Sequence, residues 1–244
     1  VKKEELLELL GNTYFKGGFL QRSNEIFLRI LKFSPRNKNA LKSLLLVNEK
    51  LKNFKKSKEI AQALEELNID VSVEKVYFDT LIILNDPILS YEKRTELLFE
   101  IFKENKIIQR IFATFLIQSN REFFFSNIDM FDCEKLIDIL WYQKKEDIDF
   151  DKIKNNQFLN ELYSAKNYIN SVSTSSDFDL NILILINKYQ KDIKTNLTFE
   201  FICNSCKHSS PFYEARCPNC HSILSLEVKH HLTKAYELSN QSLQ

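Results

Sequence analysis

The chain has 244 residues, enough for one large domain or two small ones, and its 44% hydrophobic and 27% charged residues exclude wholesale disorder. Only 3 glycines and 4 prolines are present, which excludes an all-β fold rich in tight turns and also excludes Gly-rich phosphate-binding loops. The formal net charge of +1 gives no overall electrostatic attraction to nucleic acid or to an anionic membrane. These properties predict a mostly helical protein.

Residues 4–69 contain an internal repeat of 34 residues with the spacing of tetratricopeptide repeats. In such a repeat, a small residue lets the first helix approach the second, and large apolar residues fill the space between them. The first copy carries Leu7, Leu10, Gly11, Tyr14, Ser23, Phe27, Ile30 and Pro35, and the second carries Leu41, Leu44, Leu45, Ser57, Ala61 and Leu64. Asn48 and Ile69 replace the aromatic residue and the proline, so the second copy is degenerate. We predict two tetratricopeptide repeats over residues 1–69, with Gly17-Gly18 in the first turn.

The helical pattern continues without a readable repeat over residues 70–196. Ser90 and Asp132 are placed to cap two of these helices. The predicted helices are Val73–Leu84, Tyr91–Glu104, Ile107–Gln118, Cys133–Tyr142, Phe158–Ile169 and Leu180–Tyr189. The predicted fold class is therefore all-α, a tetratricopeptide-like α-solenoid of about ten to twelve helices with a degenerate continuation over 70–196.

The pattern changes after residue 196. Leu197–Phe201 alternates as a short strand does, and Ile223–Leu226 is predicted as the returning strand. Between them lie four of the five cysteines. We predict a small four-cysteine zinc ribbon over residues 197–228, followed by a short helix or tail over residues 229–244.

The cysteines form the one strong chemical motif of the chain. Cys203-Asn-Ser-Cys206 and Cys217-Pro-Asn-Cys220 are two C-x2-C pairs separated by ten residues. Two such pairs supply four thiolates in a tetrahedron around Zn²⁺ and leave no open position, which predicts a structural metal. Iron can take the same four sulfurs, and a redox pair or disulfides are the alternative interpretation. Metal-binding cysteines indicate a reducing compartment.

Other candidate residues favour structural roles. We interpret Cys133 as a buried inert thiol, Trp141 and Phe123–Phe125 as core, and the acidic run 146–151 as a solvated turn. The four histidines near the cysteines are interpreted as surface residues or supporting neighbours of the site rather than metal ligands: His208, His221, His230 and His231. No serine–histidine–aspartate set, HExxH motif or pair of catalytic carboxylates is found, so we do not expect an enzyme.

Tetratricopeptide repeats followed by a four-cysteine ribbon resemble the bacterial lipopolysaccharide assembly protein B family. The resemblance is carried by Leu7–Pro35, by the second repeat to Leu67, by Phe201–Cys206 and by Cys217–Cys220, whose Cys-Pro-x-Cys pair looks like that of a rubredoxin-like ribbon. Family members often have glycine after the second ribbon cysteine, where this chain has Lys207.

The resemblance implies a non-enzymatic adaptor at the cytoplasmic face of the inner membrane. Family members are held there by an N-terminal helix and engage an FtsH-type AAA protease that degrades the deacetylase committing carbon to lipid A. This chain begins with Val1 rather than Met, so we expect that such an anchor would precede this soluble fragment. The basic first 67 residues, with 14 Lys and Arg against 8 Asp and Glu, are compatible with a membrane-proximal segment.

As an adaptor, the chain is expected to bind protein partners, including membrane proteins, through the groove that the first helices of the repeats create. The predicted groove residues are Glu8, Asn12, Phe15, Lys42, Leu46 and Glu49. The client is left open. The alternative role for a chain of the same architecture is that of an accessory protein or chaperone that stabilises an inner-membrane complex, such as a flagellar motor stator. Two alternatives of other classes are nucleic-acid binding by the ribbon, disfavoured by its 4 Lys and Arg against 3 Glu over residues 203–244, and an iron-containing electron carrier.

Overall fold

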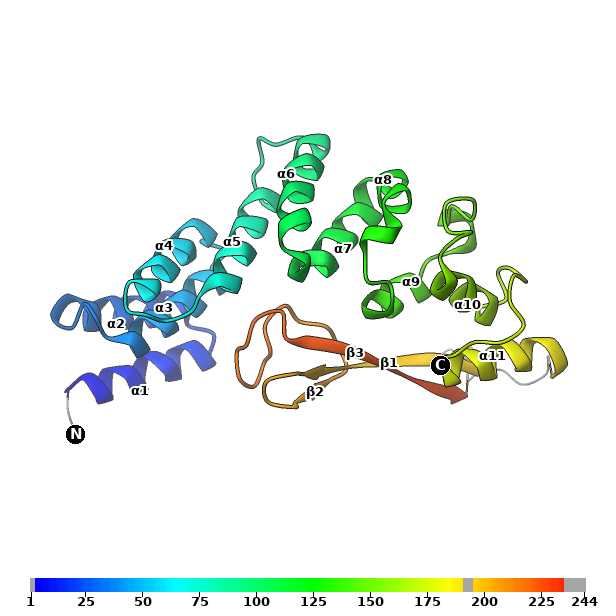
Figure 1. The fold of residues 1–244 in the computed structure, drawn as a ribbon. Coiled ribbons are helices and arrows are strands. Elements are labelled where there is room, and N and C mark those ends of the chain that lie inside the picture. The colour runs from blue at the N-terminus through cyan, green and yellow to red at the C-terminus, as the bar shows by residue number, and fades with distance from the viewer. Residues whose placement is uncertain (1–2, 191–194, 235–244) are drawn as a thin grey trace, which may run out of the picture. The chain divides into compact units, whose positions relative to one another are not determined.

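The computed structural model describes residues 3–190 and 195–234 (Figure 1). Within these ranges the chain folds into eleven α-helices, four short 3-10 helices and three strands. The α-helices are α1 (Lys3–Lys16), α2 (Leu20–Phe33), α3 (Lys38–Lys50), α4 (Phe54–Glu65), α5 (Ser72–Leu84), α6 (Tyr91–Glu104), α7 (Gln109–Ser119), α8 (Arg121–Ser126), α9 (Ile137–Trp141), α10 (Gln157–Ala165) and α11 (Phe178–Tyr189). The 3-10 helices are η1 (Lys106–Ile108), η2 (Ile128–Met130), η3 (Glu134–Leu136) and η4 (Lys145–Asp147), and the strands are β1 (Thr195–Cys203), β2 (Ser209–Ser210) and β3 (Leu226–Lys234). The mostly helical prediction is confirmed.

Two units make up the chain, residues 1–108 and residues 109–244. The first contains α1–α6, and the second contains α7–α11 together with the sheet. This division differs from the predicted boundaries at residues 69 and 196, because β3 packs on α9 and α11 of the second unit. None of the helices in the described ranges is long and apolar enough to cross a bilayer.

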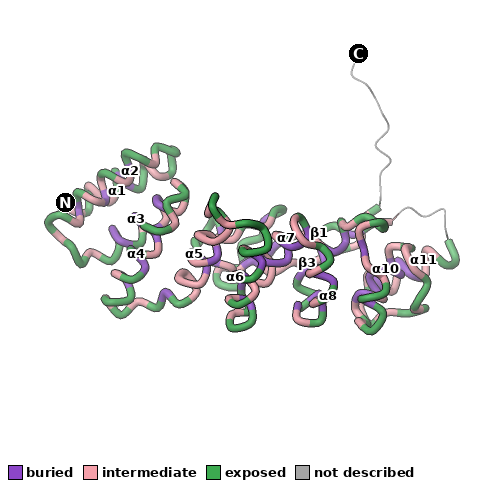
Figure 2. Tube along the Cα trace, turned by 90° about the horizontal axis from the view of Figure 1, so that it is seen from above, coloured by how far each residue is buried: buried purple, intermediate pink, exposed green. Residues whose placement is uncertain are grey.

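In the first unit, each helix packs against the next one along the chain, from α1 to α6. Buried segments, purple in Figure 2, alternate with exposed ones along these helices. The core includes Phe27, Leu64, Phe78 and Phe102, all fully or almost fully buried. Helices paired with their neighbours in sequence are the expected form of a helical repeat.

The first two helix pairs repeat the same buried contacts. Helix α2 begins at Leu20 and α4 begins at Phe54, one period of 34 residues later. Ser23 is fully buried in α2, and its hydroxyl donates to the carbonyl of Gly11 at 2.8 Å. The equivalent Ser57 of α4 is also fully buried, and its hydroxyl lies 3.5 Å from the carbonyl of Leu45, the residue equivalent to Gly11. The predicted 34-residue period is therefore present in the packing.

Gly11 marks the closest approach of α1 and α2. A Cβ atom at this position would lie 2.7 Å from Cζ of Phe27 and 2.9 Å from Cε1, which is closer than van der Waals contact allows. We therefore expect Gly11→Leu to force the first helix pair apart and to lower the free energy of unfolding of the first unit by about 1–3 kcal/mol.

Urea denaturation followed by circular dichroism checks this prediction. Thr13→Leu is the matched control, because Thr13 lies on the same helix and its side chain is exposed. Equal stability of the Gly11→Leu and Thr13→Leu chains would contradict the close packing of α1 on α2.

Several predicted elements agree with the structure. Helix α6 has the predicted bounds, and the Ser90 hydroxyl accepts from the backbone N–H of Lys93 as a cap. Gly18 has φ of 76° in the turn after α1, the left-handed conformation that glycine allows. The predicted helix Cys133–Tyr142 is shorter, because the chain forms η3 before α9 begins at Ile137. Helix α8 was not predicted.

A three-stranded sheet is present where two short ribbon strands were predicted beside the helices, so the described residues are mostly helical but not all-α. Its strand order is β2-β1-β3, both pairs are antiparallel, and β1 and β3 pair over nine residues each. The returning strand begins at Leu226 and not at Ile223, and residues 229–234 are strand rather than the predicted short helix or tail. The physical reason is pairing: Leu232 faces Leu197 and Val228 faces Phe201 across the two strands. Residues 235–244 of that prediction lie outside the described residues.

Candidate metal centre

Each of the two C-x2-C pairs closes a tight turn of the same form. The backbone N–H of Lys207 donates to the carbonyl of Cys203 at 2.8 Å, and that of His221 donates to the carbonyl of Cys217 at 2.9 Å. The first turn follows β1 directly, and the second precedes β3. The antiparallel pairing of β1 with β3, which aligns Cys203 with Leu226, fixes the two ends of this segment together.

The residue after each pair has a left-handed backbone. Lys207 has φ of 59° and His221 has φ of 62°, a region that costs a non-glycine residue about 1–2 kcal/mol. Glycine would adopt this conformation without the steric cost. We expect Lys207→Gly to stabilise the ribbon by up to about 1 kcal/mol, less than the full strain because glycine also gains entropy in the unfolded chain. Thermal melting checks this, with the neighbouring exposed His208→Gly as control; a lower melting temperature for Lys207→Gly would contradict it.

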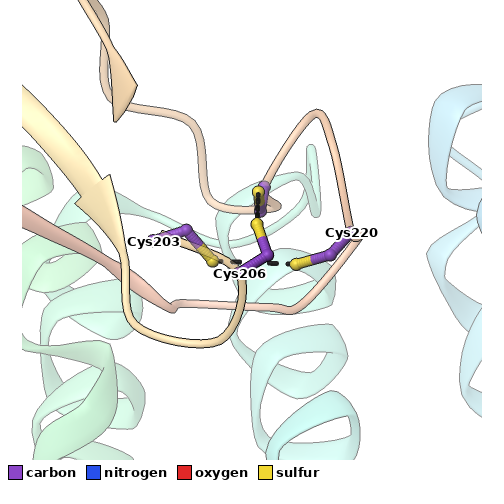
Figure 3. A group of neighbouring side chains, drawn as sticks. Cys203, Cys206 and Cys220 are labelled. Carbon is purple, nitrogen blue, oxygen red and sulfur yellow. Dashed lines mark hydrogen bonds between the residues drawn. The ribbon is translucent and has the colours of Figure 1, made fainter. Parts of the chain in front are cut away.

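The four sulfurs point toward one centre (Figure 3). The Sγ atoms of Cys203 and Cys220 are 3.7 Å apart, those of Cys206 and Cys217 are also 3.7 Å apart, and all four lie within 4.8 Å of one another. Four sulfurs placed tetrahedrally at about 2.3 Å from a metal are separated by about 3.8 Å. The four predicted ligands are thus brought together at the spacing of a four-thiolate site, and they can bind a metal ion.

Hydrogen bonds and burial shift the pKa values of Cys203 and Cys217 in opposite directions. Burial raises the pKa of Cys203, but hydrogen bonds from the Ser225 hydroxyl and from the backbone N–H groups of Cys206 and Ser205 outweigh it and lower this pKa to about 6. At Cys217, burial dominates and raises the pKa to about 11. The metal-free chain therefore keeps a proton on Cys217 at neutral pH, while Cys203 is largely a thiolate.

Metal binding is expected to release a proton at neutral pH. The metal takes thiolates, so the proton on Cys217 must leave when the ion binds. Because the pKa of Cys217 lies well above 7, the apparent metal affinity should rise at least about tenfold for each pH unit through the neutral range.

Competition with a chromophoric chelator at several pH values measures this dependence, after correction for protonation of the chelator. Cys133→Ala provides a chain with the same ligands and should keep the same slope. An affinity that does not change with pH would contradict the prediction.

The fifth cysteine lies apart from this group, as predicted. Cys133 is 5% exposed, and burial, with the nearby Asp132 and Asp129 carboxylates, raises its pKa to about 12. Trp141, Phe124 and Phe125 are buried, in agreement with the predicted core role, whereas Phe123 is half-buried. The metal-binding group found in the described residues contains no histidine. His230 and His231 instead contact carboxylates, at 3.1 Å from Asp177 and 2.9 Å from Glu200.

The ribbon (residues 195–234) has a very small core of its own. Its buried cluster consists of Phe201, Leu226 and two of the cysteines, Cys203 and Cys217, with Tyr213 and Val228 packed against it. So few apolar side chains bury too little surface to hold a fold of this size. A metal ion bound by the four cysteines would supply stabilisation, in addition to the contacts with the helices of the second unit.

Arg110 joins the ribbon to the helices. Its guanidinium lies 4.1 Å from the ring centroid of Tyr213 and 5.2 Å from that of Phe201, close enough for cation–π attraction. The same group forms an ion pair with both carboxylate oxygens of Asp138 in α9, and the two side chains are only 12% and 11% exposed. A second attachment is the hydrogen bond from Nε1 of Trp141 to Oδ1 of Asn196, at 3.0 Å. Sequence reasoning missed these contacts because they join residues far apart in the chain.

The predicted groove residues lie on α1 and α3, which contact each other. Asn12 and Lys42 are exposed, and Glu8, Phe15, Leu46 and Glu49 are half-buried. The Glu8 carboxylate accepts a hydrogen bond from Asn37 at 2.9 Å, and that of Glu49 accepts one from the Tyr77 hydroxyl at 3.3 Å. These two glutamates therefore help to join successive helices, and the role of the six residues in partner binding stays a prediction.

Comparison with known proteins gives no family. No protein-family model matches this chain, and no curated protein matches it.

Proposed function

We propose that this chain is a non-enzymatic adaptor that binds protein partners through a tetratricopeptide-like α-solenoid and carries a structural zinc ion in its ribbon. The observation that carries the proposal is the repetition of the Ser23 and Ser57 contacts one period apart, in helix pairs that pack in chain order. Repeats of this kind leave one long face of adjoining helices available to a partner.

Zinc is the metal that best suits the ribbon. The donor set is four cysteine sulfurs, and the sulfur spacing of 3.7 Å fits the Zn–S distance of about 2.3 Å. Iron accepts the same ligands, and the two are distinguished by colour, because ferric thiolate sites absorb visible light and zinc sites do not. Four thiolates fill the coordination shell, so the metal would stabilise the ribbon and would have no open position for catalysis.

For the place of action we propose the cytoplasmic face of the bacterial inner membrane. This rests on the resemblance to the lipopolysaccharide assembly protein B family, which implies an FtsH-type protease as partner and lipopolysaccharide synthesis as the regulated process. An accessory or chaperone role for an inner-membrane complex, such as a flagellar motor stator, is a second candidate of the same class.

A crosslinked pull-down of the full-length protein from its native membrane, read by mass spectrometry, tests the proposal. Recovery of the AAA protease together with the lipid A deacetylase is the expected result. Recovery of motor subunits would keep the adaptor role and identify the motor complex as the client. A chain carrying Asn12→Lys and Lys42→Glu should lose its partner, whereas Lys32→Glu, an exposed change on α2, should not. Equal recovery with all three chains would contradict binding by the α1–α3 face.

A further inference from the structure

A cavity of about 680 Å³ lies in the first unit, away from the predicted groove. It is formed by two turns, the one between α3 and α4 and the one between α5 and α6. Its volume is in the range of pockets that bury a ligand or several side chains of a peptide. Four apolar side chains line it: Phe54, Ile82, Pro87 and Ile88.

The cavity is also rich in positive charge. Lys52, Lys55 and Lys56 line it, and none of them has an acidic partner among the residues that the structure describes. The one carboxylate in the lining is Asp86, which accepts a hydrogen bond from the backbone N–H of Ile88 at 2.9 Å. By contrast, Lys58 in the same helix is paired with Asp79. Three lysines without an acidic partner among the described residues thus line one cavity.

Two local features stand at the edge of the cavity. Lys52 has φ of 60°, the left-handed conformation that Gly18 adopts one period of 34 residues earlier, so this backbone belongs to the turn of the repeat. Ile88 is 91% exposed and lies in the same lining as the three lysines. A partner with an apolar side chain would cover Ile88.

We infer that this cavity binds a peptide segment of a partner protein in which an apolar side chain is flanked by acidic residues. The apolar side chain would contact Phe54, Ile82 and Ile88, and the acidic residues would face the three lysines. A flat anionic bilayer would meet the lysines without filling the cavity, so a peptide fits the surface better. The inference rests on the proposed function, that the chain binds proteins, but it concerns a different surface from the α1–α3 face.

Selection from a random peptide library displayed on phage, against the full metal-loaded chain, tests the inference. Peptides that combine Asp or Glu with an apolar residue should be enriched. The best of them, measured by fluorescence polarisation, should bind at least about tenfold more weakly to the Lys52→Glu, Lys55→Glu, Lys56→Glu chain, because three attractions become repulsions. A matched chain with Lys16→Glu, Lys32→Glu and Lys38→Glu, exposed lysines outside the cavity lining, should bind as well as the unchanged chain.

A second variant separates binding from folding. Lys52→Gly should raise the melting temperature, because glycine takes the left-handed backbone conformation without steric cost. The same change should nevertheless weaken peptide binding, because it removes one lysine from the cavity. Selected peptides that bind equally to the triple Lys→Glu chain would overturn the cavity as their site and leave the adaptor proposal standing. No selected peptide at all would overturn both. The last outcome concerns a membrane. If no peptide is selected, and the unchanged chain binds vesicles of equimolar phosphatidylcholine and phosphatidylglycerol while the triple Lys→Glu chain does not, the occupant is not a peptide.

Discussion

Loss of the metal from the full chain will unfold the ribbon and loosen the helices of the second unit, while the first unit keeps its structure. The expected cause is the small ribbon core, in which two of the four buried residues, Cys203 and Cys217, are themselves ligands. Structural zinc sites contribute about 10–16 kcal/mol in isolated zinc-finger peptides, far more than such a core supplies. Cys217→Ser should have the same effect as a chelator.

Hydrogen–deuterium exchange read by mass spectrometry locates the effect. Amides of β1 and β3 should lose protection, followed by those of α7 and α9, which carry Arg110 and Asp138 against the ribbon. Helices α2–α4 should exchange as before. Cys133→Ala is the control, because it removes a buried thiol of the same unit and leaves the four ligands in place. Unchanged protection of α7 and α9 after metal removal would contradict the coupling of ribbon and helices.

Removing the carboxylate of Asp138 will strongly destabilise the second unit. Among the described residues, Asp138→Ala leaves the Arg110 guanidinium with the carbonyl of Lys135 at 3.2 Å and the two aromatic rings as partners, in a position 12% exposed to water. Breaking a buried ion pair by removing one partner costs about 3–5 kcal/mol, because the remaining charge is left uncompensated.

A double-mutant cycle distinguishes this charge effect from a simple loss of packing. Arg110→Met combined with Asp138→Leu removes both charges and keeps apolar volume, so it should recover most of the lost stability. Lys154→Ala, which breaks the exposed pair with Asp151, is the control and should cost less than about 1 kcal/mol. Additive effects of the two Arg110 and Asp138 changes in urea denaturation would contradict a coupled pair.

Local sequence signals predicted much of the helical part. Gly11 was expected to permit close packing, and the 2.7 Å distance from its added Cβ to Phe27 agrees with that expectation. Ser90 was expected to cap a helix, and its hydroxyl does so. The four cysteine ligands follow from spacing alone, because two C-x2-C turns bring four sulfurs together once the strands pair.

Elements that depend on partners distant in sequence were not predicted. Leu226, Val228 and Leu232 follow the alternation of a strand, but His230 interrupts it, and pairing with β1 makes residues 229–234 a strand. The short helix α8 begins where the Asn120 side chain accepts a hydrogen bond from the backbone N–H of Phe123. In the sequence, the aromatic run of this helix indicates only buried residues and no element type. The Arg110–Asp138 pair and the lysine-lined cavity join separate elements, so neither has a local pattern.

The measurement that tests the central claim most directly is X-ray absorption at the zinc edge, together with metal analysis, on the purified full chain. We predict one zinc ion per chain with four sulfur neighbours at about 2.3 Å, and loss of the ion in Cys217→Ser but not in Cys133→Ala. A chain without metal, a shell that contains nitrogen, or cysteines joined as disulfides would contradict a four-cysteine metal centre that holds the ribbon together.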